Sequence, residues 1–249
     1  DAGYVYPKSG LDSDLRFETT PAYVSTGSLA LTGAGNGTNE GLQLDGITWT
    51  SLGAWSVAFW VRTASFASGK IYFDASHSSN SDRVKISDAS GAIQIYTVNG
   101  GSDGTATFSG VSDRIEDGSW HHVAITSTYS APNSTFKLYL DGQLVGTSSA
   151  ILAPDMSTAG DAFVGAFYTG ANDHPTASFC HFGIWNSELD ESEVRALMTA
   201  TTYAEATSKS GATPKHYYLL ESNGNDSVGT QDGTVTGPAI IAGDRARLP

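Results

Sequence analysis

The sequence predicts an all-β protein in which two antiparallel sheets pack face to face. Short runs of alternating apolar and polar residues recur along the chain, and a period of two is typical of half-buried strands. The 28 Gly residues and many Ser and Thr residues crowd the segments between these runs, as turns require. Five Trp, eleven Tyr and ten Phe residues supply bulky side chains for a core. A chain of 249 residues is long enough to form one large β-sandwich.

Ten segments carry the strand pattern. The clearest is 55–62, in which Val57, Phe59 and Val61 occupy alternate positions. No repeat of about 20–50 residues is visible, which disfavours a propeller or a solenoid. The predicted strands, in chain order, are residues 29–31, 42–44, 55–62, 70–74, 83–87, 92–98, 120–127, 136–140, 162–167 and 179–185.

One segment, 190–198, has helical rather than strand periodicity. Asp190 is a favourable N-cap residue, and Glu193 lies three positions later, which is the spacing of a capping box. Val194 and Leu197 then belong to one apolar stripe at helical spacing. The sequence therefore predicts one short helix near residues 190–198.

The domain organisation follows from where these patterns begin and end. Residues 1–27 are predicted to form an N-terminal arm or an extra strand, and residues 28–200 to form the sandwich. Residues 201–249 are predicted to form a polar linker and C-terminal tail strands that pack on the same domain.

Within this tail, the stretch 199–213 is small and polar without a clear period, which predicts a connecting loop. Residues 216–220 and 234–236 are candidates for two further strands.

The charge excludes several classes of partner. The formal net charge is −13, with only 13 Lys and Arg residues and no basic run, so nucleic acid and anionic membrane surfaces are repelled. Polyanionic glycans are repelled as well unless a cation bridges the two. No apolar run reaches the ~20 residues that a membrane-spanning helix needs. Cys180 is the single cysteine, so no intrachain disulfide can form.

Three blocks of sequence resemble the laminin G-like, pentraxin-like branch of the concanavalin A superfamily. The first is the strand 55–62. The second is Asp117-Gly-Ser-Trp-His-His-Val-Ala followed by Leu138-Tyr-Leu-Asp-Gly-Gln-Leu-Val-Gly, whose Asp-Gly pair is also a strong hairpin signal. The third joins Phe163-Val-Gly-Ala to Phe182-Gly-Ile-Trp-Asn-Ser-Glu-Leu-Asp-Glu. The resemblance covers roughly residues 28–200 and implies a jelly-roll sandwich that acts as a surface recognition module.

Candidate metal ligands lie in two polar loops. Asp74, Asn80 and Asp82 offer the hard oxygen atoms that Ca²⁺ prefers, and Asn172 and Asp173 offer more in a second loop. We expect the two loops to lie on the same rim of the sandwich. The resemblance implies Ca²⁺ as the candidate cofactor, because members of this family often bind it at such a rim. Neither loop has a strict ligand spacing, so a solvated loop is the alternative.

Candidate glycan-binding residues are aromatic side chains near loops or strand ends. A sugar site combines an aromatic face with neighbouring polar groups. Most aromatic residues of a sandwich lie in its core, so packing is the alternative role for each candidate. These candidates are Tyr72, Tyr96, Tyr129 and Tyr168.

Two patterns are reminiscent of catalysis. Glu188, Asp190 and Glu193 have the E-x-D-x-x-E spacing of jelly-roll β-glucanases, in which two carboxylates flank the glycosidic bond. That chemistry needs an extended strand, whereas these residues are predicted to cap a helix. His121 and His122 are neighbours on a predicted strand, so their side chains point to opposite faces and cannot share one metal or substrate.

The sequence therefore favours a non-catalytic surface recognition module, glycan-binding or adhesive, on an extracellular, cell-surface or virion surface. Its partners would be a glycan or a surface protein, without nucleic acid or membrane insertion. The alternative is a structural exterior component of a phage or other virus, such as a decoration, spike or tail protein that contacts itself or capsid and tail proteins. The segment 216–237 resembles segments of tailed-phage surface proteins, which motivates that alternative. A polysaccharide hydrolase or lyase is a third, weaker hypothesis.

Overall fold

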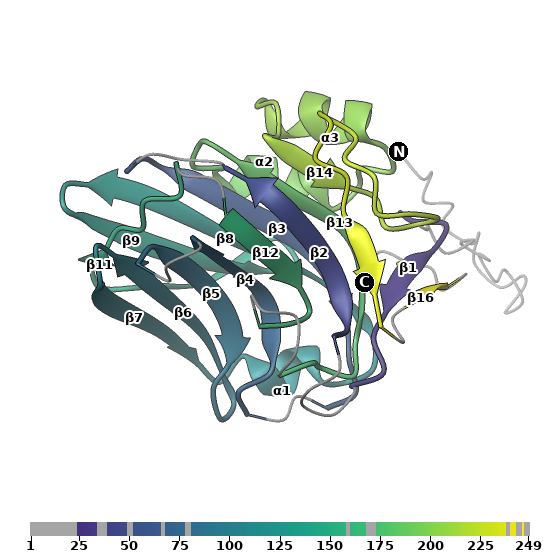
Figure 1. The fold of residues 1–249 in the computed structure, drawn as a ribbon, viewed down its shortest axis with the longest axis horizontal. Coiled ribbons are helices and arrows are strands. Elements are labelled where there is room, and N and C mark those ends of the chain that lie inside the picture. The colour runs from purple at the N-terminus through teal and green to yellow at the C-terminus, as the bar shows by residue number, and fades with distance from the viewer. Residues whose placement is uncertain are drawn as a thin grey trace, which may run out of the picture.

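Two antiparallel sheets stacked face to face form the body of the protein (Figure 1). The computed structural model describes residues 24–33, 39–48, 52–65, 68–77, 81–157, 160–167, 173–237, 240–242 and 246. The predicted all-β, two-sheet jelly-roll sandwich is confirmed. Within these described residues, no helix is both long and apolar enough to cross a lipid bilayer.

Among the described residues, the larger sheet has nine strands in the order β10-β9-β8-β3-β13-β1-β16, with β11 paired to β9 and β14 paired to β13. Its strands are β1 (Ser28–Ala30), β3 (Trp55–Arg62), β8 (Trp120–Ser130), β9 (Asn133–Leu140), β10 (Gln143–Thr147), β11 (Ile151–Leu152), β13 (Ser178–Trp185), β14 (His216–Tyr218) and β16 (Ile240–Ala242).

The smaller sheet has seven strands in the described part of the chain, in the order β15-β2-β12-β4-β5-β6-β7. Its strands are β2 (Gly41–Ile47), β4 (Ile71–His77), β5 (Arg83–Asp88), β6 (Ala92–Asn99), β7 (Ser102–Ser109), β12 (Gly160–Val164) and β15 (Thr234–Thr236). The segment 216–249 thus contributes strands to both sheets, since β14 pairs with β13, β15 with β2 and β16 with β1.

The core lies between the sheets and is rich in aromatic rings. Phe59 and Phe182 from the nine-stranded sheet meet Tyr72 and Phe73 from the seven-stranded sheet, and all four are fully buried. The ring centroids are 5.9 Å apart for Phe59 and Tyr72 and 5.0 Å apart for Phe73 and Phe182. Each buried ring of this kind contributes roughly 1.5–3 kcal/mol of burial free energy, so the rings help to hold the two layers together. The single cysteine, Cys180, is buried.

Each of the ten predicted strand segments coincides with a strand, although several boundaries move. The predicted strand 162–167 ends early, because β12 stops at Val164 and Gly165 takes a left-handed φ of 80°. The predicted helix is confirmed as α2 (Glu191–Leu197). The Glu193 backbone N–H donates to Asp190 Oδ1 at 2.9 Å, and the Asp190 N–H donates to Glu193 Oε2 at 2.7 Å.

The prediction of a connecting loop over 199–213 is wrong, because the segment contains a second helix, α3 (Tyr203–Ser210). The Thr202 hydroxyl accepts a hydrogen bond from the Glu205 N–H at 3.2 Å, and Gly211 ends the helix with a left-handed φ of 65°. Both are ordinary helix-end signals. The apolar stripe that would have revealed the helix is weak. A short third helix, α1 (Ser112–Ile115), precedes β8.

Candidate functional site

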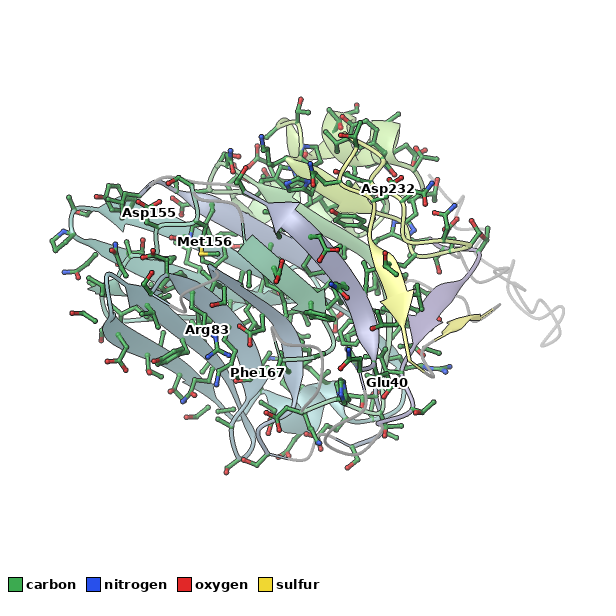
Figure 2. All side chains as sticks on the ribbon, viewed as in Figure 1. Glu40, Arg83, Asp155, Met156, Phe167 and Asp232 are labelled. Atoms are coloured by element: carbon green, nitrogen blue, oxygen red, sulfur yellow. The ribbon has the colours of Figure 1, made fainter. Side chains whose placement is uncertain are left out.

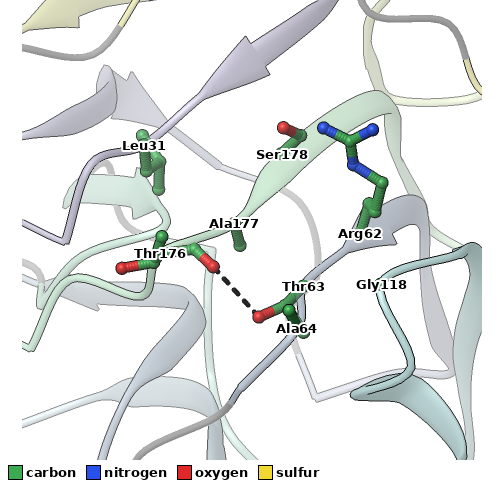
Figure 3. Close-up of a pocket in the computed structure, with 8 residues that line it drawn as sticks. All are labelled: Leu31, Arg62, Thr63, Ala64, Gly118, Thr176, Ala177 and Ser178. Carbon is green, nitrogen blue, oxygen red and sulfur yellow. Dashed lines mark hydrogen bonds between the residues drawn. The ribbon is translucent and has the colours of Figure 1, made fainter.

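Two neighbouring pockets open at one end of the sandwich, where the connections β1–β2, β3–β4 and β12–β13 meet the turn before β8. The first, the Arg62 pocket, has a volume of about 380 Å³. The second, the His174 pocket, has a volume of about 310 Å³. Ala64 and Thr176 line both pockets and therefore form the boundary between them. The described residues of the Arg62 pocket are Leu31, Arg62, Thr63, Ala64, Gly118, Thr176, Ala177 and Ser178 (Figure 3), and those of the His174 pocket are Gly33, Ala64, Ser65, Lys70, His174 and Thr176.

Hydrogen bonds between distant segments hold this boundary in place. The Thr63 hydroxyl donates to the Thr176 carbonyl oxygen at 3.0 Å, as the dashed line in Figure 3 shows. The Gly118 N–H donates to the Thr63 carbonyl oxygen at 3.0 Å, and the Leu31 N–H donates to the Ala177 carbonyl oxygen at 2.8 Å. Four separate parts of the chain are thus tied together at one place, which pre-organises both pockets.

His174 is the unusual residue of the second pocket. Its side chain is fully buried, and neither Nδ1 nor Nε2 has a hydrogen-bond partner in the part of the chain that the structure describes. A neutral imidazole carries one donor and one acceptor, and burying either group without a partner costs about 1–3 kcal/mol. His174 is nevertheless one of the residues that line the second pocket. A polar group that enters this pocket and bonds a ring nitrogen would reduce that cost.

Gly33 allows the chain to pass close to the boundary. Its φ is +72°, and a Cβ atom at this position would lie only 2.4 Å from Thr176 Oγ1. Glycine is therefore required here both by the backbone conformation and by the close approach. On the opposite side, the Ile71 N–H donates to the Asp173 carbonyl oxygen at 3.1 Å, which anchors the segment next to His174.

The electrostatic character of the pockets differs from that of the whole chain. Arg62 and Lys70 are half-buried at the pockets, and the Arg62 guanidinium lies 5.6 Å from the centre of the Trp120 ring. None of the described lining residues is acidic. The chain as a whole has 26 acidic and 13 basic residues, so this is a local reversal of charge.

The predicted metal ligand Asp74 forms an ion pair, and it does not lie in a loop. Asp74 is fully buried, and Arg83 Nε donates to Asp74 Oδ1 at 2.8 Å while Arg83 Nη2 binds Oδ2. The Arg83 guanidinium lies 4.4 Å from the centre of the Phe167 ring, and Figure 2 labels both residues on the outer side of the seven-stranded sheet. An arginine already neutralises this carboxylate, so Asp74 does not fit a Ca²⁺ ligand.

The expectation that the two polar loops share one rim is also wrong. Asp173 is bonded to Ile71 at the start of β4, whereas Asp82 follows the other end of β4 and accepts a hydrogen bond from the Gly100 N–H at 3.1 Å. A seven-residue strand spans about 20 Å, so these carboxylates cannot bind one ion.

No group of three or more acidic, His or Cys side chains suited to a metal occurs among the described residues. The Ca²⁺ donor set therefore does not fit the part of the chain that the structure describes. Asn80 and Asn172 lie outside that part. Asp173 instead lies near Lys85, together with Asp74. Burial lowers the pKa of Lys85, as does Arg83, while both carboxylates oppose the shift.

The candidate glycan-binding tyrosines are dispersed. Tyr72 is fully buried in the core, so the prediction that it binds a glycan at the surface is wrong. Tyr96 is half-buried, with Lys85 Nζ 5.4 Å from the ring centre. Tyr129 is half-buried near the end of β8, and Tyr168 lies outside the described residues. None of the three described tyrosines lines the Arg62 pocket or the His174 pocket.

The carboxylates with glucanase-like spacing have structural partners. Glu188 Oε1 is 2.7 Å from Lys137 Nζ, and Oε2 accepts a hydrogen bond from the Thr128 hydroxyl at 2.6 Å. Burial would raise the pKa of Glu188, but these two hydrogen bonds outweigh burial and hold the pKa below its usual range. Glu193 completes the capping box of α2. An acid catalyst needs a raised pKa, so the environment of Glu188 is opposite to that role.

His121 and His122 have different surroundings, as expected for neighbours on a strand. His121 lies between Asp141, at 2.8 Å from Nδ1, and Asp117, at 3.1 Å from Nε2. His122 is buried against Trp60, with ring centroids 5.3 Å apart. The two rings therefore do not form one site.

Sequence reasoning missed Arg62, Lys70 and His174 as site residues. The loop that contains His174 is recognisable as polar. Its carboxylate and amide residues suggest oxygen ligands for a metal ion, and they do not point to the imidazole. Nothing in the local sequence signals that both nitrogen atoms of this ring lack partners, because that depends on segments far apart in the chain.

Comparison with known proteins agrees with this architecture. A family model described as the concanavalin A-like lectin/glucanases superfamily matches residues 36–195. A native heptameric SAP-like pentraxin from Limulus polyphemus has a TM-score of 0.57 and 14% identity, over 88% of this chain and 95% of that one. A Bacteroides ovatus protein whose suggested role is carbohydrate binding has a TM-score of 0.56 and 15% identity, over 89% of this chain and 63% of that one.

Domains LG4-5 of the mouse laminin α1 chain have a TM-score of 0.50 and 18% identity, over 70% of this chain and 45% of that one. No curated protein sequence matches this chain significantly. The pentraxin and laminin G structures confirm the resemblance that the three sequence blocks indicate. The family model covers more than half of the residues, and this chain belongs to the concanavalin A-like lectin/glucanase superfamily.

Proposed function

We propose that this protein is a non-catalytic recognition module that binds a carbohydrate at the His174 and Arg62 pockets. The single observation that carries the proposal is the buried His174, a residue that lines a pocket and whose two ring nitrogen atoms have no hydrogen-bond partner among the described residues. A sugar hydroxyl both donates and accepts hydrogen bonds, so it can pair with either imidazole nitrogen, the donor or the acceptor.

The size and the other polar groups of the pockets support a small polar ligand. Volumes of about 310 and 380 Å³ lie at the lower end of the range, about 300–1,000 Å³, that is usual for small-molecule sites. Ser65 and Thr176 are exposed at the His174 pocket and contribute hydroxyl groups. The Bacteroides ovatus protein of the same fold, for which carbohydrate binding is suggested, supports the same class of ligand.

A recognition role agrees with the state of the carboxylates. Glu188 is paired with Lys137, and Glu193 bonds the N-terminus of α2. Neither carboxylate is available in the arrangement that glycoside hydrolysis requires. The proposed role places the protein where glycans are displayed, on an extracellular, cell or virion surface, with a glycan or a glycosylated surface protein as its partner.

The alternative role as a structural component of a virus particle has no comparable support. Among the described residues, the large hydrophobic side chains that are exposed are Leu52 and Leu144. Two such residues do not make the apolar patch that a permanent protein–protein contact buries. We therefore retain one proposed function.

The test is a glycan array followed by calorimetry, with two variants. His174→Phe removes both nitrogen atoms and keeps a planar ring, so we expect binding to fall at least tenfold without loss of thermal stability. Tyr96→Ala serves as the control, because Tyr96 lies outside both pockets. Retained binding in His174→Phe together with loss in Tyr96→Ala would move the site to the outer side of the seven-stranded sheet. An array without any ligand would refute the proposed function.

A further inference from the structure

The described residues that line the two pockets carry positive charge, and binding of a neutral sugar would not require that charge. They include Arg62, Lys70 and the donor-capable ring of His174, and they include no carboxylate. At physiological ionic strength, charges more than about 8 Å apart are largely screened. A ligand inside the pockets therefore interacts mainly with these nearby groups, and only weakly with the net charge of −13.

Lys70 is the cation best placed for a ligand in the His174 pocket. It directly precedes β4, and its carbonyl oxygen accepts a hydrogen bond from the Asp88 N–H at 2.8 Å, so its backbone is anchored. Among the described residues, no carboxylate forms an ion pair with its ammonium group. Two other lysines do form ion pairs: Lys137 with Glu188, and Lys209 with Glu205.

His174 would add hydrogen bonds of defined direction to the attraction between the charge of Lys70 and the ligand. A carboxylate oxygen accepts the proton of one ring nitrogen, while a hydroxyl of the same molecule donates to the other nitrogen. Both partners are present together in a sugar that carries a carboxylate. A fully deprotonated anion such as sulfate has no hydroxyl to donate to the second nitrogen, and a neutral sugar gives the Lys70 ammonium no counter-charge.

From these observations we propose that the ligand class is a carboxylated sugar, with its carboxylate held by Lys70 and His174 and the adjoining part of the glycan extending past Ala64 and Thr176 toward Arg62. The inference rests on the proposed carbohydrate-binding function and specifies its substrate class. Heavily sulfated glycans are disfavoured, because the described lining of the pockets offers only Arg62 and Lys70 as fixed positive charges, which is too few for a ligand with many negative charges.

The test compares matched ligands in calorimetry on the full chain. Glucuronic acid is paired with glucose and galacturonic acid with galactose, as monosaccharides and as short oligosaccharides, with sulfated glucose and inorganic phosphate as the other anions. We expect at least tenfold tighter binding of the acid in each pair, and a preference that shrinks as salt rises from 20 to 500 mM. Equal binding of the acidic and neutral sugars would overturn the carboxylate assignment while leaving the proposed function intact.

The variants assign the preference to one side chain. Lys70→Gln is expected to remove the tenfold preference, so that the acidic and the neutral sugar bind equally, whereas Lys70→Arg is expected to keep most of the preference. Lys85→Gln is the matched control, since it changes the net charge equally at a half-buried lysine outside both pockets. Thermal melts of each variant establish that the fold is retained.

The remaining outcomes are also decisive. An equal loss of preference in Lys70→Gln and Lys85→Gln would show that overall charge, and not this pocket, selects the acid, and would refute the inference. Tighter binding of sulfated glucose or of free phosphate than of the uronic acids would refute it as well. Failure of every sugar, acidic or neutral, would refute both the inference and the proposed function.

Discussion

Thr63 and Thr176 are 113 positions apart in the sequence, yet the Thr63 hydroxyl donates a hydrogen bond of 3.0 Å to the Thr176 carbonyl oxygen. Thr63 directly follows β3, and Thr176 lies in the connection before β13, the strand that pairs with β3. The bond therefore joins the ends of two neighbouring strands at the point where the Arg62 and His174 pockets meet. The shape of both pockets depends on it.

Replacing this hydroxyl should weaken both the fold and the site. Thr63→Val keeps the shape of the side chain but removes the donor to the Thr176 carbonyl oxygen, which costs about 0.5–1.5 kcal/mol for a typical hydrogen bond. The Ser65 N–H, which donates to the same hydroxyl at 3.2 Å, loses its acceptor as well. Urea denaturation measures the change in the free energy of unfolding. Thr105→Val, on an exposed strand position, is the control and should change it by less than about 0.5 kcal/mol.

The buried pair of Asp74 and Arg83 should behave as a unit. Asp74→Asn leaves a buried guanidinium without its counter-charge and should lower the free energy of unfolding by about 3–5 kcal/mol. The double variant Asp74→Leu/Arg83→Met removes both charges and should be less destabilised than the Asp74→Asn single variant. Chemical denaturation of Asp74→Leu, Arg83→Met and the double variant closes a double-mutant cycle. Additive effects of the two single changes would show that the charges are independent.

His121 should make the protein less stable at alkaline pH. The hydrogen bond to Asp141 raises the pKa of His121, despite burial, and the hydrogen bond to Asp117 adds to this. A raised pKa in the folded state stabilises the protonated form, so this contribution is complete below the unfolded pKa of about 6.5 and is lost as the pH rises through the folded value. Asp141→Asn should remove most of this loss, and Asp117→Asn, at an exposed carboxylate, should have a smaller effect. Thermal melts between pH 6 and 9 measure both, and identical profiles for the three proteins would contradict the assignment.

His122 should make the protein less stable at acidic pH. Burial lowers the pKa of His122 to about 4, so the folded protein resists protonation that the unfolded chain accepts. The free energy of unfolding should therefore fall as the pH drops from about 6.5 to 4, by up to roughly 3 kcal/mol. His122→Phe cannot be protonated and should flatten the profile in this window. The same slope in wild type and variant would indicate that carboxylate protonation causes the acid sensitivity.

Much of the fold was predictable because its determinants are local. The strand 55–62 was recognisable from its alternation, and Val57, Phe59 and Val61 do share the core between the sheets. The other face is buried as well, since Ala58 and Trp60 pack into separate clusters. The capping box of Asp190 and Glu193 is a contact between residues three apart, so the pattern contains the whole interaction. Asp141 and Gly142, with φ values of 50° and 71°, form the expected two-residue turn between β9 and β10.

Elements with weak local signals were missed. Strand β7 carries mostly small, exposed residues, because it lies at the edge of its sheet and buries only Ala106 and Phe108. Helix α3 buries only Ala206 and Ser210, so it lacks an apolar stripe, and packing against α2 supports it. Both elements are stabilised by neighbours that no local pattern identifies.

The sequence by itself determined the sandwich, its family and its helix cap, because periodicity, turn residues and capping pairs act over a few adjacent positions. Only the tertiary structure decided which loops meet at one end. Strand order and direction separate Asp82 from Asp173, pair Asp74 with Arg83, and bring His174 and Lys70 to one pocket. Among the described residues the ring nitrogen atoms of His174 have no partner there. These relationships depend on contacts between segments distant along the chain, and side-chain partners of that kind leave no pattern within either segment.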